Sequence, residues 1–196
     1  MTGGDARPLR RGVFDWRQSP GCARPDSRGR LSPRAQWRGT PDARTVAMTP
    51  KQQLDAFLKK YDPYIAGIAR RALAKMRKRL PGAVEIVYDN YNALAIGFGP
   101  NEKASLAIFS IVLYPRWVNL FFLQGANLPD RGRRLRGSGK VVRSVRLEDD
   151  TLDDPEIKNL VEVAVARAKV PIDRGQGRRL VIRSVSAKQR PRRPRG

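Results

Sequence analysis

The feature that most constrains the fold is a series of short apolar segments joined by tight links. The segments cover residues 84–88, 93–98, 105–113 and 116–123, and each has the length and alternation of a β-strand. Turn formers occupy the links, among them Gly99-Pro100-Asn101 and Tyr114-Pro115. Links this short join antiparallel neighbours, because a parallel crossover needs a dozen or more residues. The sequence therefore predicts an antiparallel meander.

Helices are expected before and after this meander. Thr49, Pro50 and Gln52 supply an N-cap, a first-turn proline and a capping-box partner, so a helix is expected to begin at Pro50. Asp62-Pro63 repeats the cap and the proline, and apolar residues then recur with the helical period as far as residue 80. Asp154-Pro155 marks a third helix. Further strands are expected at 141–147 and, as the last element, at 181–185.

These elements predict a two-layer α+β domain. Its sheet is expected to be mainly antiparallel, with about five strands and with the N-terminal and C-terminal helices packed on one face. The segment 116–123 is apolar on both faces, and Trp117, Asn119 and Phe121 alternate onto one of them. An apolar face that the helices leave open needs another partner. A bound ligand and a second copy in a homodimer are the two alternatives.

Charge and periodicity divide the chain into three parts. The 196 residues carry a formal net charge of +22, and residues 1–47 hold ten Arg, no Lys and four Asp. Because 1–47 lack any strand or helix period, we expect a disordered extension, which a translation start at Met48 would leave out. An arginine-rich targeting leader is the alternative, although such leaders are poor in acids. Residues 48–186 are the expected domain, and 187–196 form a basic Arg- and Pro-rich tail.

The composition argues against several kinds of site. The chain has no His and one Cys, Cys22, which removes the commonest general base and the commonest metal ligand. Its serines have no histidine to activate them, so a binding protein is favoured over an enzyme. No apolar run approaches the roughly 18 residues of a membrane helix. A cytoplasmic protein that does not contact a membrane is expected.

Several stretches together carry a resemblance to a known family. In order they are Pro81-Gly82-Ala83-Val84-Glu85, VYDNYNALAIGFGP, SIVLYPRWVNLFFLQGANL and LRGSGKVVRSVRL. This series resembles the YdhG-like family of bacterial domains of unknown function over roughly residues 50–170, and the ending VIRSVSAKQRPRR resembles the tail of one subgroup. The resemblance implies a small α+β domain, and one branch of the family consists of frataxin-like iron chaperones. Many members have Gly-x-Pro after the first strand, where this chain has Asp89-Asn90-Tyr91, so a site built on that turn would differ.

The preferred candidate for a ligand site surrounds this turn. Polar and aromatic side chains at the strand ends are expected to line a small pocket with apolar walls. They are Glu85, Tyr88, Asp89, Asn90, Tyr91, Trp117 and Asn119. A tight turn held by Asx hydrogen bonds is the alternative for the same stretch. The sequence does not identify a cofactor, and the ligand is either a small molecule or a metal ion.

A second candidate is the basic run before the strand expected at 141–147. Its members are Arg131, Arg133, Arg134, Arg136, Lys140, Arg143 and Arg146. Backbone N–H groups around Gly137-Ser138-Gly139 are suited to an anion, but Arg134 and Val141 stand where a P-loop requires Gly and Ser or Thr. A turn entering the strand is preferred, with anion or weak nucleic-acid binding as an addition. The tail 187–196 either adds to that binding or is simply solvated.

A third cluster is acidic and lies just after the basic run. It consists of Glu148, Asp149, Asp150, Asp153, Asp154 and Glu156. Such oxygens suit a hard cation, but acids before and at a helix N-terminus are the preferred interpretation.

Two functions follow from these patterns. The leading hypothesis is a small binding or carrier domain that holds its ligand on the open sheet face. The alternative is a nucleic-acid-associated accessory protein that uses the basic run and the tail.

Overall fold

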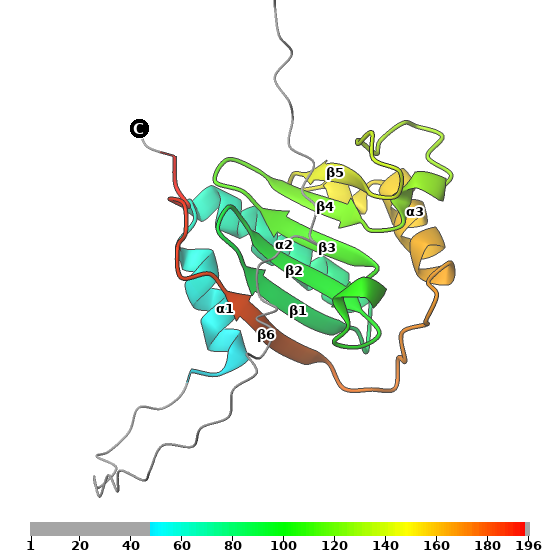
Figure 1. Cartoon of the computed structure of the whole chain (residues 1–196). Coiled ribbons are helices and arrows are strands. Elements are labelled where there is room, and N and C mark those ends of the chain that lie inside the picture. Colours follow the sequence, from blue (N-terminus) through cyan, green and yellow to red (C-terminus); the bar gives the residue numbers. More distant parts are fainter. Residues whose placement is uncertain (1–47, 195–196) are drawn as a thin grey trace, which may run out of the picture. The chain divides into compact units, whose positions relative to one another are not determined.

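The structure, a computed structural model, describes residues 48–194 (Figure 1). The extension expected at 1–47 lies outside the described residues. The helices are α1 (Pro50–Lys59), α2 (Pro63–Arg79) and α3 (Pro155–Ala166), with 3-10 turns η1 (Ala104–Leu106), η2 (Gly125–Asn127) and η3 (Thr151–Asp153). The strands are β1 (Val84–Asp89), β2 (Leu94–Gly99), β3 (Phe109–Leu113), β4 (Val118–Phe122), β5 (Arg143–Leu147) and β6 (Arg179–Val185). This confirms the α+β class.

The helix starts follow the predicted capping chemistry. The Thr49 hydroxyl accepts the N–H of Gln52 at 3.3 Å, and the Gln52 side chain accepts the N–H of Thr49 at 2.8 Å. These reciprocal bonds satisfy two N–H groups that a helix leaves unpaired. Asp62 and Asp154 cap α2 and α3, each followed by a proline in the first turn.

The sheet has six strands in the order β5-β4-β3-β2-β1-β6. Strands β1 to β5 pair antiparallel in chain order, which confirms the meander. The sheet is mainly antiparallel, as expected, but it is not purely so, because β6 adds a sixth strand that is parallel to β1. Residues 148–178, which include η3 and α3, separate β5 from β6, and this is enough chain for a parallel connection to the opposite edge.

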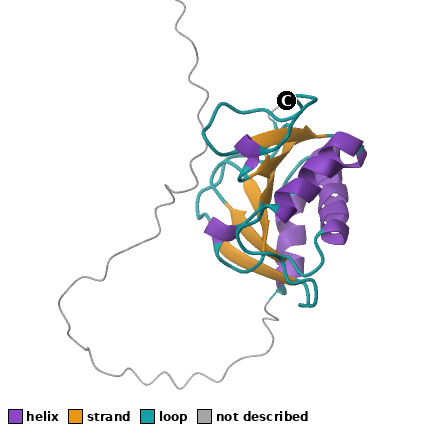
Figure 2. Ribbon diagram, turned by 90° about the vertical axis from the view of Figure 1, so that its right-hand side faces the viewer, coloured by secondary structure: helices purple, strands orange, loops and turns teal. Residues whose placement is uncertain are grey.

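The two faces of the sheet have different coverings. In Figure 2 the three α-helices lie on one side of the sheet. The main core fills that side, where Val87, Ile96 and Ile111 join Leu73 and Met76 of α2 in one buried cluster. On the opposite face, which we call the open face, Ala93, Ala95 and Val112 form a separate small cluster.

The turn between α2 and β1 depends on Gly82. Its φ of 78° is left-handed, and a Cβ there would stand 1.9 Å from the carbonyl oxygen of Asp173. Because that obstacle is backbone, no side-chain rotation relieves it. The Gln176 side-chain amide donates to the Gly82 carbonyl at 2.7 Å and to the Pro100 carbonyl at 3.2 Å. This close approach therefore fixes the segment that leads into β6.

We expect Gly82→Ala to lower the free energy of unfolding by at least about 2 kcal/mol, because left-handed strain and a backbone collision add together. Urea denaturation measures the change. Gly139→Ala is the matched control, since a Cβ at Gly139 meets nothing within 4 Å, and its effect should stay within about 0.5 kcal/mol. Equal midpoints for the two variants would contradict the role assigned to Gly82.

Candidate functional site

Strand register brings one row of side chains across the open face. Tyr88, Ala95, Val112, Asn119 and Arg146 are successive partners across β1, β2, β3, β4 and β5. Directly paired residues project on the same side of a sheet. This row therefore carries an aromatic ring at one end, and an amide next to a guanidinium at the other end.

Neighbouring rows add three more aromatic rings. Phe121 follows Asn119 by two residues and Trp117 precedes it by two, so both share its face. Trp117 is 38% exposed, and its ring lies 5.3 Å from the ring of Tyr114 at an angle of 33°. Tyr88, Tyr114 and Phe121 are half-buried against Ala93, Ala95 and Val112. We call Tyr88, Tyr114, Trp117 and Phe121 the aromatic surface.

Arginines stand on both sides of the aromatic surface. Arg136 forms an antiparallel bridge with Ser144 at the outer edge of β5, which puts it on the same face as Phe121 and Arg146. Arg183 lies on β6, where its positive charge opposes the rise that burial causes in the pKa of the Tyr88 phenol. Arg136, Arg146 and Arg183 are exposed. Within residues 48–194 none of the three forms an ion pair.

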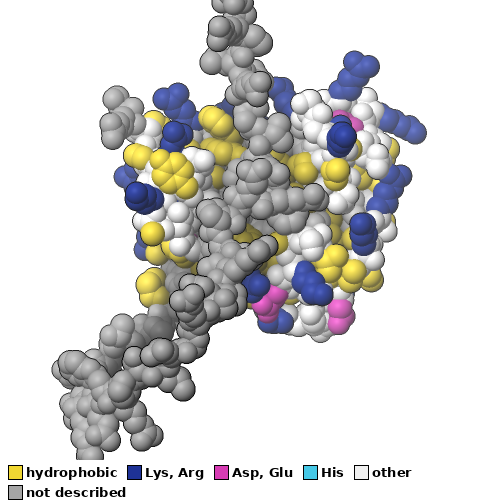
Figure 3. All heavy atoms as spheres, viewed as in Figure 1, with side chains coloured by type: hydrophobic (Ala, Val, Ile, Leu, Met, Phe, Trp, Pro, Cys, Tyr) yellow, Lys and Arg dark blue, Asp and Glu magenta, His cyan; other side chains and the backbone are white. Residues whose placement is uncertain are grey.

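The surface view agrees with this distribution. Figure 3 shows the open face from the front, with many Lys and Arg side chains around its margin and few Asp or Glu side chains. Hydrophobic side chains lie between the basic ones. The described part of this face thus combines positive charge with apolar and aromatic surface.

The residues expected around the β1–β2 turn do not form one pocket. Tyr88, Trp117 and Asn119 lie on the open face, but Glu85 and Asp89 alternate onto the helix side together with Val87. Asn90 and Tyr91 form the turn, in which the N–H of Asn90 donates to the carbonyl of Ala93 at 3.0 Å.

Glu85 is committed to a structural ion pair. Its carboxylate is 1% exposed and accepts Nε of Arg77 at 2.8 Å and a terminal nitrogen of the same guanidinium at 2.6 Å. This two-point hydrogen bond raises the pKa of Arg77. Two parallel bonds are the strongest arrangement of this pair, so Glu85 anchors α2 to β1.

Asp89 is the centre of a socket that holds the C-terminal tail. Its buried carboxylate accepts Lys60 at 2.9 Å, the side-chain amide of Gln189 at 2.7 Å and the Arg192 guanidinium at 2.7 Å. Arg192 also donates to the carbonyl of Asn90, and its guanidinium lies 5.6 Å from the centre of the Tyr61 ring. Arg192 is only 5% exposed, so the expectation of a solvated tail is wrong at this residue.

Tyr61 forms the apolar wall of this socket. It is 1% exposed, donates its hydroxyl to the Leu113 carbonyl at 3.2 Å and accepts the N–H of Leu94 at 2.9 Å. Burial raises the pKa of Tyr61 to about 12, and the charge of Arg192 opposes that rise. The neutral phenol is therefore part of the folded state.

The basic run separates into residues that are paired and residues that are exposed. Arg134 pairs with Asp154 and Glu156 at the start of α3, and Arg143 donates to the carbonyls of Gly139 and Val142. Arg136 and Arg146 face the open sheet. The remaining members, all exposed, are Arg131, Arg133 and Lys140.

Backbone N–H groups in this run already bind a carboxylate of the same chain. The N–H groups of Arg134 and Leu135 both donate to the Asp130 side chain at 2.8 Å. Gly137 has a φ of 130° and follows the bridge between Arg136 and Ser144. Gly137 is thus part of a turn. The neighbouring backbone N–H groups bind the carboxylate of Asp130.

The acidic cluster is largely committed to ion pairs. Asp149 pairs with Arg71, Asp153 pairs with Lys75 and Arg79, and Asp154 caps α3. The hydrogen bond from Lys75 lowers the pKa of the Asp153 carboxyl. In residues 48–194 no three carboxylates or thiols come together in a way that suits a metal ion.

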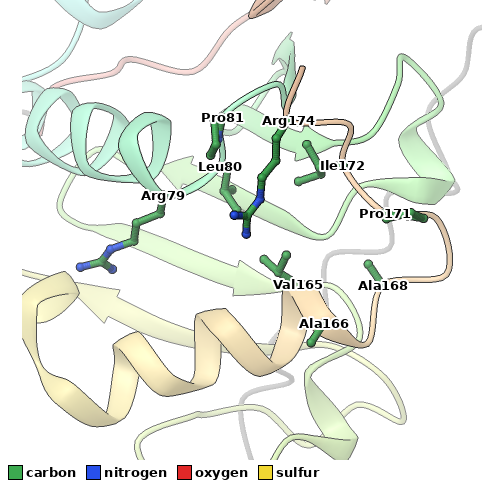
Figure 4. A pocket seen from close by; sticks show the side chains of 9 residues that line it. All are labelled: Arg79, Leu80, Pro81, Val165, Ala166, Ala168, Pro171, Ile172 and Arg174. Atoms are coloured by element: carbon green, nitrogen blue, oxygen red, sulfur yellow. The ribbon is translucent and has the colours of Figure 1, made fainter. Parts of the chain in front are cut away.

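A small cavity lies elsewhere, between the C-terminal ends of α2 and α3. It has a volume of about 250 Å³, and Leu80, Val165 and Ile172 contribute apolar walls. Figure 4 shows Arg174 pointing into the cavity and Arg79 pointing away from it. The cavity shares no residue with the sequence-predicted sites.

The fold and the open face together define a basic α+β domain with an aromatic sheet surface. No family model, no curated protein and no solved structure matches the chain. Membership of the YdhG-like family therefore stays a prediction. Among the described residues, no helix is both long and apolar enough to cross a membrane.

We expect Asp89→Asn to lower the free energy of unfolding by about 3 kcal/mol, because it leaves the buried Arg192 guanidinium without its counter-charge. Arg190→Ala is the matched control. Arg190 is exposed and only its guanidinium contacts the Tyr91 ring, at 5.7 Å, so its loss should cost less than about 1 kcal/mol. Chemical denaturation of both variants measures the difference, and similar losses would show that the socket does not stabilise the domain.

The raised pKa of Tyr61 predicts that the folded domain loses stability in alkali. Its folded pKa of about 12 exceeds the ordinary value of 10.0, so the unfolded chain releases the proton first as the pH rises. The stabilisation is therefore complete below pH 10 and declines by about 1.4 kcal/mol for each unit between pH 10 and 12. Urea denaturation of wild type and Tyr61→Phe at pH 9, 10 and 11 tests this. The variant should lose less stability over that range, and parallel curves would contradict the assignment.

Proposed function

We propose that the protein binds nucleic acid through the open face of its sheet. The observation that carries the proposal is the placement of exposed arginines and half-buried aromatic rings on one face, opposite the helices. Arginine is attracted to phosphate, and aromatic rings supply a surface on which bases can stack. The residues proposed to contact the ligand are Tyr88, Trp117, Asn119, Phe121, Arg136, Arg146 and Arg183.

The distribution of charge favours this function over the alternative that the positive charges only keep the protein in solution. Several cations on the helix side, though not Arg70 or Lys78, are paired across elements, as in Arg71 with Asp149 and Arg77 with Glu85. Arg136 and Arg146 have no ion-pair partner among residues 48–194 and stand next to apolar surface. Unpaired guanidinium groups beside partly exposed aromatic rings suit a ligand with both phosphates and planar bases.

The basic run contributes a second element to the proposed contact. Arg131, Arg133 and Lys140 are exposed in the same loop that brings Arg136 to the edge of β5. They would add phosphate contacts that carry no sequence information. The tail contributes less than its charge suggests, since Arg192 is held by Asp89.

The small-ligand carrier stays a competing proposal. Its strongest support is the apolar floor of Ala95 and Val112 below Tyr88 and Asn119. The separation of Glu85 and Asp89 from that floor removes two of the polar groups on which it was based. Salt distinguishes the two functions, because a ligand enclosed in an apolar pocket stays bound when phosphate contacts are screened.

We expect an end-labelled oligonucleotide to bind the full chain with an affinity that falls steeply as salt rises. Fluorescence anisotropy at several salt concentrations gives the slope of log K against log salt. The double variant Arg136→Gln/Arg146→Gln should lower the magnitude of that slope by roughly 1 to 2, because each lost phosphate contact contributes about 0.7 to 0.9.

The matched control is Arg70→Gln combined with Lys78→Gln, which removes the same charge from exposed positions of α2. The control should keep a slope close to that of wild type. An equal change in both double variants would show that net charge, and not the open face, drives binding. Absence of binding at low salt would overturn the proposal and leave the carrier function to be tested by native mass spectrometry.

A further inference from the structure

Given the proposed function, we infer that the ligand is a single strand whose bases stack on Phe121, Trp117 and Tyr88. The spacing of these rings and the lack of an α-helix on the described part of the open face favour a single strand over a duplex. Its phosphates would lie along the β5 edge, at Arg136 and Arg146.

The described part of the open face presents no α-helix that could enter the groove of a duplex. Proteins that read duplex bases insert a helix or a two-stranded ribbon into the major groove. In the described residues the three α-helices all lie behind the sheet in the view of Figure 1, as the turned view of Figure 2 makes clear. On the open face, the backbone of Ala107 lies 3.0 Å from where a Cβ of Gly99 would stand, so the nearby η1 segment is packed down on the sheet. The side chains that remain to meet a ligand there rise from the strands and from the loop before β5.

The rings are too far apart for neighbouring bases of a stacked helix. Trp117 immediately precedes β4, and Phe121 lies four residues later on the same face, which corresponds to about 14 Å at the rise of a strand. Tyr88 is three strands away from β4, again about 14 Å. Successive bases of a duplex strand rise only about 3.4 Å. Two or more of these rings can therefore be used together only by a strand whose bases are unstacked.

The polar groups between the rings fit the same geometry. Ser110 and Ser144 flank Phe121 in its row, and Asn119 lies between Val112 and Arg146 in the next. Hydroxyl and amide groups next to a stacked base can bond its exposed edge, which is available only in unpaired nucleotides. The β5 edge then offers Arg136 and Arg146 to the backbone of the same strand.

Phe121 is the residue whose role is easiest to isolate. It carries no polar atom and no charge, so a loss of affinity on Phe121→Leu reports the ring face and not phosphate attraction. Base stacking on an aromatic ring changes affinity by about fivefold to a hundredfold. Tyr64→Leu is the matched control, since Tyr64 is 63% exposed but lies on α2.

The test uses the full chain and four probes of equal length at one salt concentration. These are a single-stranded DNA, the same sequence as single-stranded RNA, an abasic strand, and the DNA as a duplex. We expect both base-bearing single strands to bind at least about fivefold more tightly than the abasic strand and the duplex. Phe121→Leu should remove most of that advantage, leave the abasic affinity unchanged and keep the salt slope, whereas Tyr64→Leu changes none of them.

The outcomes separate the inference from the function on which it rests. If abasic strand, duplex and base-bearing strands bind equally, with a slope that depends on Arg136 and Arg146, the face binds phosphates and the stacking inference is wrong. If no probe binds, the proposed function fails as well. A difference between the DNA and RNA strands identifies the natural source of the strand. Quenching of Trp117 fluorescence by base-bearing strands but not by the abasic strand provides a second measurement, should Phe121→Leu fail to fold.

Discussion

The buried carboxylate of Asp89 holds the two ends of the domain together. A carboxylate that is almost fully removed from water must be surrounded by cations and hydrogen-bond donors. Lys60 comes from the end of α1, while Gln189 and Arg192 come from the last described residues. Because these donors are up to 132 residues apart in the sequence, neutralising one side chain fixes the start of the domain, the first strand and the tail relative to one another.

The parallel position of β6 follows from the same anchor. Strand β6 has only β1 as a neighbour in the sheet, and the N–H of Ser186 continues that pairing by donating to the Asp89 carbonyl at 2.8 Å. Gly82 allows the segment before β6 to approach the α2–β1 turn, and Arg192 fixes the segment that follows β6. The edge strand is thus held at both ends, and it covers the edge of β1 that would otherwise expose unpaired backbone groups.

Local chemistry made much of this fold predictable, and non-local contacts account for the rest. The caps at Thr49, Asp62 and Asp154 and the short links of the meander depend on residues within a few positions of each other. The direction of β6 depends on Asp89 and Arg192, which no sequence pattern joins. For the site, strand alternation already placed Trp117 and Asn119 on one face. The same rule, applied to β1, separates Glu85 and Asp89 from Tyr88, since residues at odd spacing project to opposite faces.

Ion pairs take up part of the positive charge on the helix side of the domain. Carboxylates that follow β5 are drawn to the basic side of α2, where Asp149 meets Arg71 and Asp153 meets Lys75 and Arg79. Asp154, at the start of α3, forms an ion pair with Arg134. These three carboxylates therefore hold α3 and the loop before it against the rest of the domain. On the open face, Arg136, Arg146 and Arg183 have no ion-pair partner among residues 48–194, and that face also carries the aromatic rings. A polyanion with planar groups is the ligand class that satisfies both properties at once.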